Sequence, residues 1–158
     1  MLTFKRKLIL TKAQEQRILS WIGVCRLIYN MGLEIKKETW KNKQANVSSY
    51  ELQKQLKYIK NYNWIKDVPH GSLAHQLDKL DLAYKVFFKT HKKGGGFPKF
   101  KSKKSKYSIL LKQEKAIICV TGNKINLPKI KELKFHKDSP IEGNIKTATV
   151  VKEATGWF

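Results

Sequence analysis

Three consecutive glycines, Gly94 to Gly96, separate two parts of the sequence whose apolar residues follow different periods. Upstream of them, apolar residues recur every three or four positions, which is typical of amphipathic helices. Downstream, from residue 107, short β-prone runs are separated by turn residues, which is typical of strands. Residues 2–10 alternate like an opening strand. This order excludes a purely helical or purely β chain, and we predict an α+β fold.

Three helices are predicted between the opening strand and the glycines. Each begins at residues that can satisfy the free N–H groups of a first turn, either by a capping box or by a proline with a nearby serine. The first helix is expected to run toward Trp40, and the third to stop at the glycines. The predicted cap residues are Thr11 with Gln14, Ser48 with Glu51, and Pro69 with Ser72.

The second part of the chain is predicted to form a small antiparallel β-barrel, with the helical bundle inserted after the barrel's first strand. We therefore expect a barrel domain of residues 1–10 and 97–158 and a helical domain of residues 11–96. A last strand begins at Trp157, directly before the end of the sequence, so we expect a longer protein of which this is the front part. The other strands are predicted at residues 107–111, 116–120, 125–127, 133–135 and 144–151.

Positive charge far exceeds negative charge. Lys and Arg number 33 and Asp and Glu 12, which gives a formal net charge of +21. A surface this basic attracts polyanions, because binding releases their condensed counterions. We therefore predict a nucleic-acid partner, with an anionic membrane surface or an acidic protein as the alternative. Hydrophobic residues make up 41% of the chain, enough for a packed core, which excludes a wholly disordered basic tail.

The sequence lacks the signatures of secreted and membrane proteins. No apolar run approaches the ~20 residues of a membrane span, and residues 1–7 lack the apolar stretch of a signal peptide. The two cysteines, Cys25 and Cys119, make no disulfide framework, and Cys25 is expected in the core. We predict a cytoplasmic location and no membrane partner.

A lysine-rich segment follows the third predicted helix. Residues 89–106 contain eight lysines and no acid, together with the glycines and two aromatic residues, Phe97 and Phe100. Such a segment suits a loop that tracks phosphates and stacks its rings on bases. The alternative is a solvated linker whose phenylalanines fold back as anchors. The candidate residues for RNA or phosphate binding are Arg6, Lys92, Lys93, Phe97, Lys99, Phe100, Lys101, Lys103, Lys104 and Lys106.

No arrangement of residues predicts an active site. His70 and His75 are five positions apart, whereas two zinc ligands on one helix face are four apart. Asp78 and Asp81 are the closest carboxylate pair, and Asp81 is expected to pair with Lys85 on a solvated helix face. We therefore predict no catalytic residues, no metal ligands and no cofactor for this chain.

One polar residue stands out in the first predicted helix. Asn30 follows the apolar run Leu27 to Tyr29. A polar side chain beside such a run is expected to form a hydrogen bond that fixes one helix against another.

Several segments together resemble the N-terminal half of the TnpB family, transposon-encoded RNA-guided DNA nucleases related to miniature type V CRISPR effectors. Each motif is weak alone, but their order and spacing match over nearly all of the chain. The segments are Cys25–Asn30 (the R-x-x-Y-N signature), Leu80–Lys89 (L-x-x-A-Y-K-x-F-F), Gly96–Lys103 (G-x-P-R/K-F-K-S-K), Leu127–Ile130 (L-P-K-L/I) and Gly143–Phe158 (the final hairpin).

The resemblance implies a wedge domain, a β-barrel of OB-like type, with a helical recognition domain inserted at Thr11. These domains would bind the scaffold of a guide RNA derived from the transposon end, read a short motif on target double-stranded DNA, and support the guide–target heteroduplex. The family's RuvC-like nuclease domain, with its divalent metal such as Mg²⁺, is absent from this sequence. The chain alone is therefore expected not to be an enzyme.

By the same resemblance, the residues that read the DNA motif are Tyr50, His70, Gly71, Ala74 and Lys112. The start of a helix suits this role, because its free N–H groups favour phosphate. Two alternatives remain open at this point. The chain could be a natural short form that regulates by binding nucleic acid without a nuclease, or an unrelated basic DNA-binding module. We expect a prokaryotic, nucleoid-associated protein.

Overall fold

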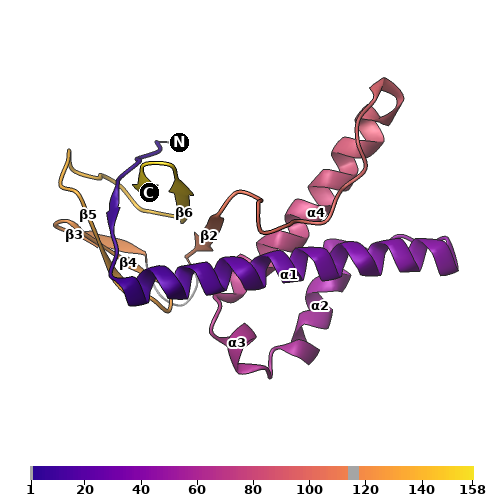
Figure 1. Ribbon diagram of the computed structural model, residues 1–158, viewed down its shortest axis with the longest axis horizontal. Helices are drawn as coiled ribbons and strands as arrows, with labels where there is room; N and C mark the ends of the chain where they lie inside the picture. The colour runs from indigo at the N-terminus through magenta and orange to yellow at the C-terminus, as the bar shows by residue number, and fades with distance from the viewer. Residues whose placement is uncertain (1, 114–117) are drawn as a thin grey trace. The chain divides into compact units, whose positions relative to one another are not determined.

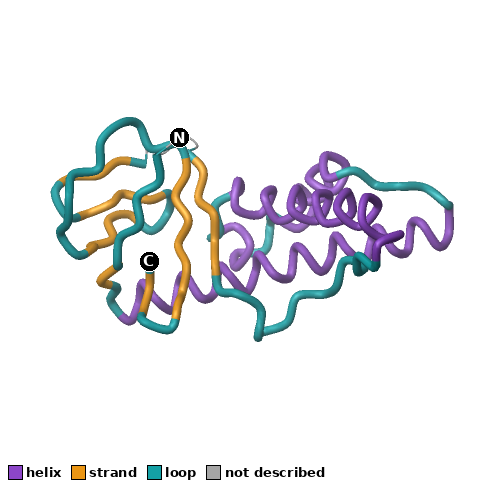
Figure 2. Tube along the Cα trace, turned by 90° about the horizontal axis from the view of Figure 1, so that it is seen from above, coloured by secondary structure: helices purple, strands orange, loops and turns teal. Residues whose placement is uncertain are grey.

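The structure is a computed structural model that describes residues 2–113 and 118–158. The contacts divide the chain into two units, which are described separately. We call Met1–Ile22 with Lys106–Phe158 the β unit, and Gly23–Ser105 the helical unit. The division cuts the first helix between residues 22 and 23. The strands belong to the β unit and the remaining helices to the helical unit, and Figure 2 colours strands and helices differently. The predicted domain bounds, 1–10 with 97–158 and 11–96, stay a prediction.

The elements follow the predicted order of strand, helices and further strands, and the α+β class is confirmed (Figure 1). Their bounds are β1 Leu8–Ile9, α1 Lys12–Lys43, α2 Ser49–Ile59, α3 Asn63–Lys66, α4 His70–Thr90, the 3-10 helix η1 His91–Lys93, β2 Ser108–Lys112, β3 Cys119–Thr121, β4 Lys124–Leu127, β5 Lys131–Phe135, β6 Thr147–Glu153 and β7 Gly156–Trp157.

The β unit contains two antiparallel sheets, ordered β1-β5-β4-β3 and β2-β6-β7. Their inward side chains, among them Ile109, Leu111, Leu133 and Val150, form the core of the unit. A closed barrel is not confirmed, because the strands described in residues 2–113 and 118–158 form two separate sheets. The predicted strand at 116–120 lies partly outside the described residues, and β3 begins at Cys119.

The opening strand is shorter than its alternating pattern predicts. Only Leu8 and Ile9 pair with β5, opposite Phe135 and Lys134. Leu2, at the other end of the pattern, is 82% exposed. Alternation makes a strand possible, but a partner strand must also be present, and β5 reaches only the end of the segment.

The start of α1 confirms the first predicted capping box. The Thr11 N–H donates to Gln14 Oε1 at 3.0 Å, and the Gln14 N–H donates to Thr11 Oγ1 at 3.2 Å. One turn on, Glu15 accepts a hydrogen bond from Trp157 Nε1 at 2.9 Å and one from Lys152 at 3.2 Å. These bonds, that of Trp157 first, lower the pKa of Glu15. They tie the final hairpin to α1 within the β unit.

The core of the helical unit lies where α1, α2 and α4 meet. Leu33, Leu73 and Leu80 are fully buried there. Gly32 permits the close approach of α1 to α4, because a Cβ at this position would lie 2.8 Å from a methyl carbon of Leu77. Leu77 is buried as well, so a larger residue at Gly32 would have to displace packed side chains.

After α1, one helix start differs from the prediction and one short helix was not predicted. The second capping box is confirmed, with Ser48 and Glu51 bonded reciprocally at the start of α2. At the start of α4, however, the predicted Ser72 cap is wrong: Pro69 is the N-cap without a side-chain hydrogen bond, and Ser72 is buried. The one-turn helix α3 was not predicted, because a helix of 4 residues shows no apolar period.

Helix α1 is long and apolar enough, by length and composition alone, to cross a membrane. Half of the relevant 18-residue window is buried inside the structure. Ile22, Cys25, Ile28 and Leu33 contribute to this buried face, which confirms the expected core position of Cys25. We therefore interpret α1 as the core helix of the fold.

Candidate nucleic-acid interface

The lysine-rich loop, residues 94–105, begins where η1 ends at Gly94 in the left-handed conformation, with φ 88°. The chain then turns back along α4 (Figure 1). The Phe97 ring meets the rings of Tyr84 and Phe87 edge-on, with centroids 5.3 and 5.2 Å apart. The Lys37 ammonium lies 4.4 Å from the centre of the Phe100 ring. Both phenylalanines thus contact the helices, as in the alternative that the sequence left open, and remain 42% and 48% exposed.

Asn30 fixes the loop backbone to α1. Its Nδ2 donates to the Lys101 carbonyl at 3.0 Å, and its Oδ1 accepts from the Lys101 N–H at 2.8 Å. The predicted hydrogen bond of Asn30 is therefore present, but its partner is the backbone of a loop and not a second helix. A side-chain amide matches an extended backbone in this way because it offers both a donor and an acceptor.

The Lys101 side chain is held inside the helical unit. Its ammonium donates to Gln76 Oε1 at 3.1 Å and lies 3.9 Å above the centre of the Tyr29 ring. Burial, with a smaller contribution from the Lys79 charge, lowers the pKa of Lys101 to about 8. Burial also raises the pKa of the nearby Cys25 thiol to about 12. Of the predicted phosphate-binding lysines, Lys101 is thus placed as an anchor.

The lowered pKa predicts a pH dependence of stability. In an unfolded chain Lys has a pKa of roughly 10.4, so between about pH 8 and that value the unfolded state binds more protons than the folded state. The cost of burying the charge is fully present below this window, and the free energy of unfolding should rise with pH across it. Urea unfolding at several pH values should show that the free energy of unfolding rises with pH in the parent protein relative to Lys101→Met. Parallel pH profiles would contradict the prediction.

The remaining lysines of the loop point outward. Lys99, Lys103 and Lys104 are exposed. The last two sit in a turn closed by Ser102 and Ser105, whose backbone and hydroxyl groups exchange hydrogen bonds of 3.0 Å. This turn fixes the backbone that carries Lys103 and Lys104, while their side chains extend into solvent. Three further predicted residues are also exposed: Lys92 and Lys93 on η1, and Lys106 directly after the loop.

Arg6 is occupied within the β unit. Its side chain is only 12% exposed and lies 3.3 Å from the Asp138 carboxylate. It also donates to the Ser139 carbonyl and hydroxyl at 2.8 and 3.0 Å. These contacts place Arg6 as a residue that holds the segment after β5. Lys112, at the end of β2 opposite Thr147, is half-exposed.

The other residues implied in DNA reading lie on the first turns of α2 and α4. Tyr50 is 67% exposed, and the Lys54 ammonium lies 4.5 Å from the centre of its ring. His70 is exposed, and Ala74 is half-buried one turn further along α4. Gly71 lies between them, half-buried. Leu73 and Leu77 face the core, as predicted.

The predicted ion pair of Asp81 with Lys85 is wrong. Asp81 pairs instead with Lys36 of α1 at 2.6 Å, and the Lys36 side chain is only 3% exposed. Sequence reasoning missed Lys36, although a signal was present. Lys36 continues the apolar stripe of Cys25, Tyr29 and Leu33 at helical spacing, and a lysine on a buried stripe requires an acidic partner.

Two comparisons with known proteins bear on this arrangement. The family model HTH_OrfB_IS605, described as a helix-turn-helix domain, matches residues 1–45. A protein of Escherichia coli (strain K12), named "Putative RNA-guided DNA endonuclease InsQ", is 26% identical over 148 residues, which cover 92% of this chain. The chain is TnpB-like. This confirms the resemblance of the motifs, and the chain spans 36% of the length of that relative.

The segment of the TnpB-like chain that matches the family model does not itself form a helix-turn-helix. Residues 8–9 form β1, and Lys12–Lys43 form one uninterrupted helix of 32 residues. A helix-turn-helix requires two helices joined by a short turn.

The described residues of the TnpB-like chain do not fit a divalent metal. Within 2–113 and 118–158, no three His, Cys, Asp or Glu side chains come together as a metal site requires. The nearest acids, Asp78 and Asp81, are engaged by hydrogen bonds and by Lys36.

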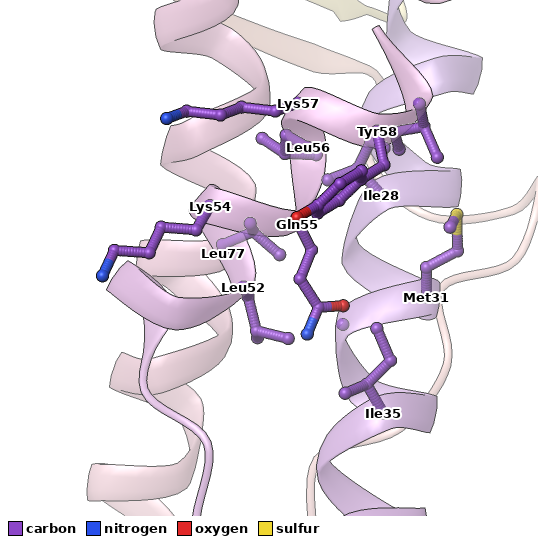
Figure 3. A pocket seen from close by; sticks show the side chains of 12 residues that line it. Ile28, Met31, Ile35, Leu52, Lys54, Gln55, Leu56, Lys57, Tyr58 and Leu77 are labelled. Atoms are coloured by element: carbon purple, nitrogen blue, oxygen red, sulfur yellow. The ribbon is translucent and has the colours of Figure 1, made fainter.

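A groove of about 660 Å³ lies between α1 and α2 of the TnpB-like chain. Its lining is mostly apolar, with Ile28 and Met31 on one side and Leu56 on the other. Lys54 and Lys57 belong to its rim but extend away from it (Figure 3). None of the predicted binding residues lines this groove, so the groove is separate from the candidate interface.

Proposed function

We propose that this TnpB-like chain binds a guide-RNA scaffold from the transposon end through its lysine-rich loop. The observation that carries the proposal is that some residues of the loop contact the helices while others are exposed. Phe97, Phe100 and Lys101 contact the helices. Lys99, Lys103 and Lys104 remain exposed, the last two on a closed turn. A loop whose backbone is already ordered loses less freedom on meeting phosphates, which favours tight binding.

The comparisons support RNA and DNA as partners, because the similar E. coli protein is named as an RNA-guided DNA endonuclease. We infer that the chain also reads a short motif on duplex DNA and contacts the guide–target heteroduplex. The two sheets of the β unit would serve as the wedge domain. The setting we propose is the cytoplasm of a prokaryote, near the nucleoid. Titration of a labelled structured RNA at increasing salt tests the proposal, and affinity that does not fall with salt would contradict it.

The chain alone is expected to bind nucleic acid without cutting it. Hydrolysis of DNA by two metal ions requires clustered acids that hold the ions about 4 Å apart, and the acidic residues of this sequence are few and scattered. Incubation of the 158-residue chain with RNA and duplex DNA in Mg²⁺ or Mn²⁺ should therefore leave the DNA intact. Cleavage that Asp78→Ala or Asp81→Ala abolishes would refute this expectation.

Motif reading by α4 predicts an altered preference for Ala74→Gln. A longer side chain at this half-buried position would reach different base-edge groups in the major groove. We expect the motif selected from a randomised duplex library to change, while affinity for structured RNA stays within about twofold, because the lysine-rich loop is untouched. His70→Ala is the companion variant. If both variants select the parent motif, α4 does not read the DNA.

A further inference from the structure

Two carboxylates of α4 hold the first turn of α2. Asp81 Oδ2 accepts a hydrogen bond from the backbone N–H of Ser49 at 2.8 Å. Asp78 Oδ1 accepts from the Ser49 hydroxyl at 3.0 Å and from Gln53 Nε2 at 2.9 Å. Hydrogen bonds to ionised carboxylates are stronger than neutral ones. The start of α2 is thereby fixed to α4 at Ser49, the residue directly before Tyr50.

These bonds are not required to start α2. The Ser48 and Glu51 capping box satisfies the N–H groups of Ser48 and Glu51 without them. Leu52 and Leu56 bury its apolar face in the core. The contacts of Ser49 therefore fix the direction in which α2 starts relative to α4, in a helix that is already capped and packed.

Lys36 extends the arrangement to α1. Its ammonium pairs with Asp81 Oδ1 at 2.6 Å, donates to the Val47 carbonyl, and lies 3.5 Å from Asn46 Oδ1. The segment that leads into α2 is thus held from the same buried cation that holds Asp81. Three helices meet at this point, and the first turn of α2 has little freedom to move.

The residues of α4 that hold Ser49 share a face with those implied in DNA reading. His70, Ala74, Asp78 and Asp81 follow one another at spacings of four, four and three, which is one face of a helix. Tyr50 is attached to the far part of this face, through Ser49, while Ala74 and His70 lie on its near part. The hydrogen bonds of Asp78 and Asp81 to Ser49 therefore determine the position of Tyr50 along α4.

We propose that Asp78 and Asp81 are positioning residues for DNA-motif recognition: they fix Tyr50 relative to Ala74 and so determine how sharply one motif is preferred. The inference rests on the proposed role of Tyr50 and Ala74 in reading the DNA motif. A recognition site loses discrimination when its supporting contacts allow displacements of about 1 Å. Because these hydrogen bonds end at Ser49, a substitution at Ser49 can remove them without altering Tyr50, Ala74 or the lysine-rich loop.

The decisive variant is Ser49→Pro. Ser49 is the first residue of α2, a position that proline favours, and the preceding Ser48 is extended with φ −75° and ψ 162°, which suits a residue before proline. Proline has neither the N–H that bonds Asp81 nor the hydroxyl that bonds Asp78. The matched control is Ser49→Ala, which removes the hydroxyl alone.

Three measurements on the full chain decide the matter: thermal unfolding, affinity for a labelled RNA hairpin, and binding to a randomised duplex library. We expect Ser49→Pro to stay folded with a lower melting temperature, because the proline ring displaces the N–H that bonds Asp81. It should keep the RNA affinity of the parent but lose about tenfold in preference for the selected motif. Ser49→Ala should lose less. Full preference in Ser49→Pro would overturn the inference.

A parent protein that binds the RNA hairpin but selects no motif gives a different result. It would overturn the proposed reading of DNA, and the positioning role with it, while leaving the RNA-binding proposal intact. If Ser49→Pro does not fold, Asp78→Ala decides by the same criteria. That variant removes the hydrogen bonds of Asp78 to Ser49 and Gln53.

Discussion

Replacement of Lys99, Lys103, Lys104 and Lys106 by alanine is expected to weaken binding of structured RNA by about 10²-fold at physiological salt. All four side chains are exposed, so each can neutralise a phosphate and release counterions. The slope of log affinity against log salt should become shallower by about 3, since each lost contact contributes about 0.7 to 0.9. Fluorescence anisotropy over a salt series measures both quantities.

The matched control removes the same amount of charge from exposed sites elsewhere. Lys41, Lys43, Lys134 and Lys137 are exposed and lie outside the lysine-rich loop, and their replacement by alanine should change affinity and slope much less. Equal effects of the two sets would show that net charge, and not the loop, governs binding.

A single substitution separates the anchor of the loop from its charges. Asn30→Ala removes both hydrogen bonds to the Lys101 backbone without changing any lysine. We expect this variant to bind RNA more weakly with an almost unchanged salt slope, because the contacts remain possible but the loop must be ordered on binding.

Features that depend on neighbours in sequence could be predicted. The capping boxes at Thr11 and Ser48 join residues three positions apart, and both form as the sequence indicates. The strands β2, β4, β5 and β6 overlap the predicted runs, because the apolar and turn residues that define them are local. The α+β class follows from the same local patterns.

Features that depend on contacts between distant segments of the chain could not be predicted from the sequence. The opening strand is cut to Leu8 and Ile9 by the reach of its partner β5, more than 120 positions away. Ser72 is buried instead of capping α4, because the helix packs with that side inward. In the site, the anchoring role of Lys101 depends on Asn30, 71 positions away. The composition of the loop indicated cations and aromatic rings, but not which of them face inward.

The ion pair of Lys36 and Asp81 provides a sharp test of such a distant contact. Asp81→Asn should reduce the free energy of unfolding by about 3 kcal/mol, because it leaves a buried ammonium without its counter-charge. Lys36→Met should cost less, about 1 to 2 kcal/mol. The Asp81 side chain is 24% exposed and still accepts the Ser49 N–H, whereas the Lys36 side chain is 3% exposed.

The double variant Lys36→Met with Asp81→Asn should be clearly more stable than the sum of the single effects predicts, since methionine removes the charge that Asp81→Asn leaves unpaired. Lys85→Met is the informative control. Lys85 lies four positions after Asp81, where an exposed helical ion pair was predicted, and its removal should change stability by no more than about 0.5 kcal/mol. Urea denaturation of the four variants measures these values. Additive effects at Lys36 and Asp81, together with a comparable loss at Lys85, would show that Asp81 is held by its neighbour on α4 and not by the buried lysine of α1.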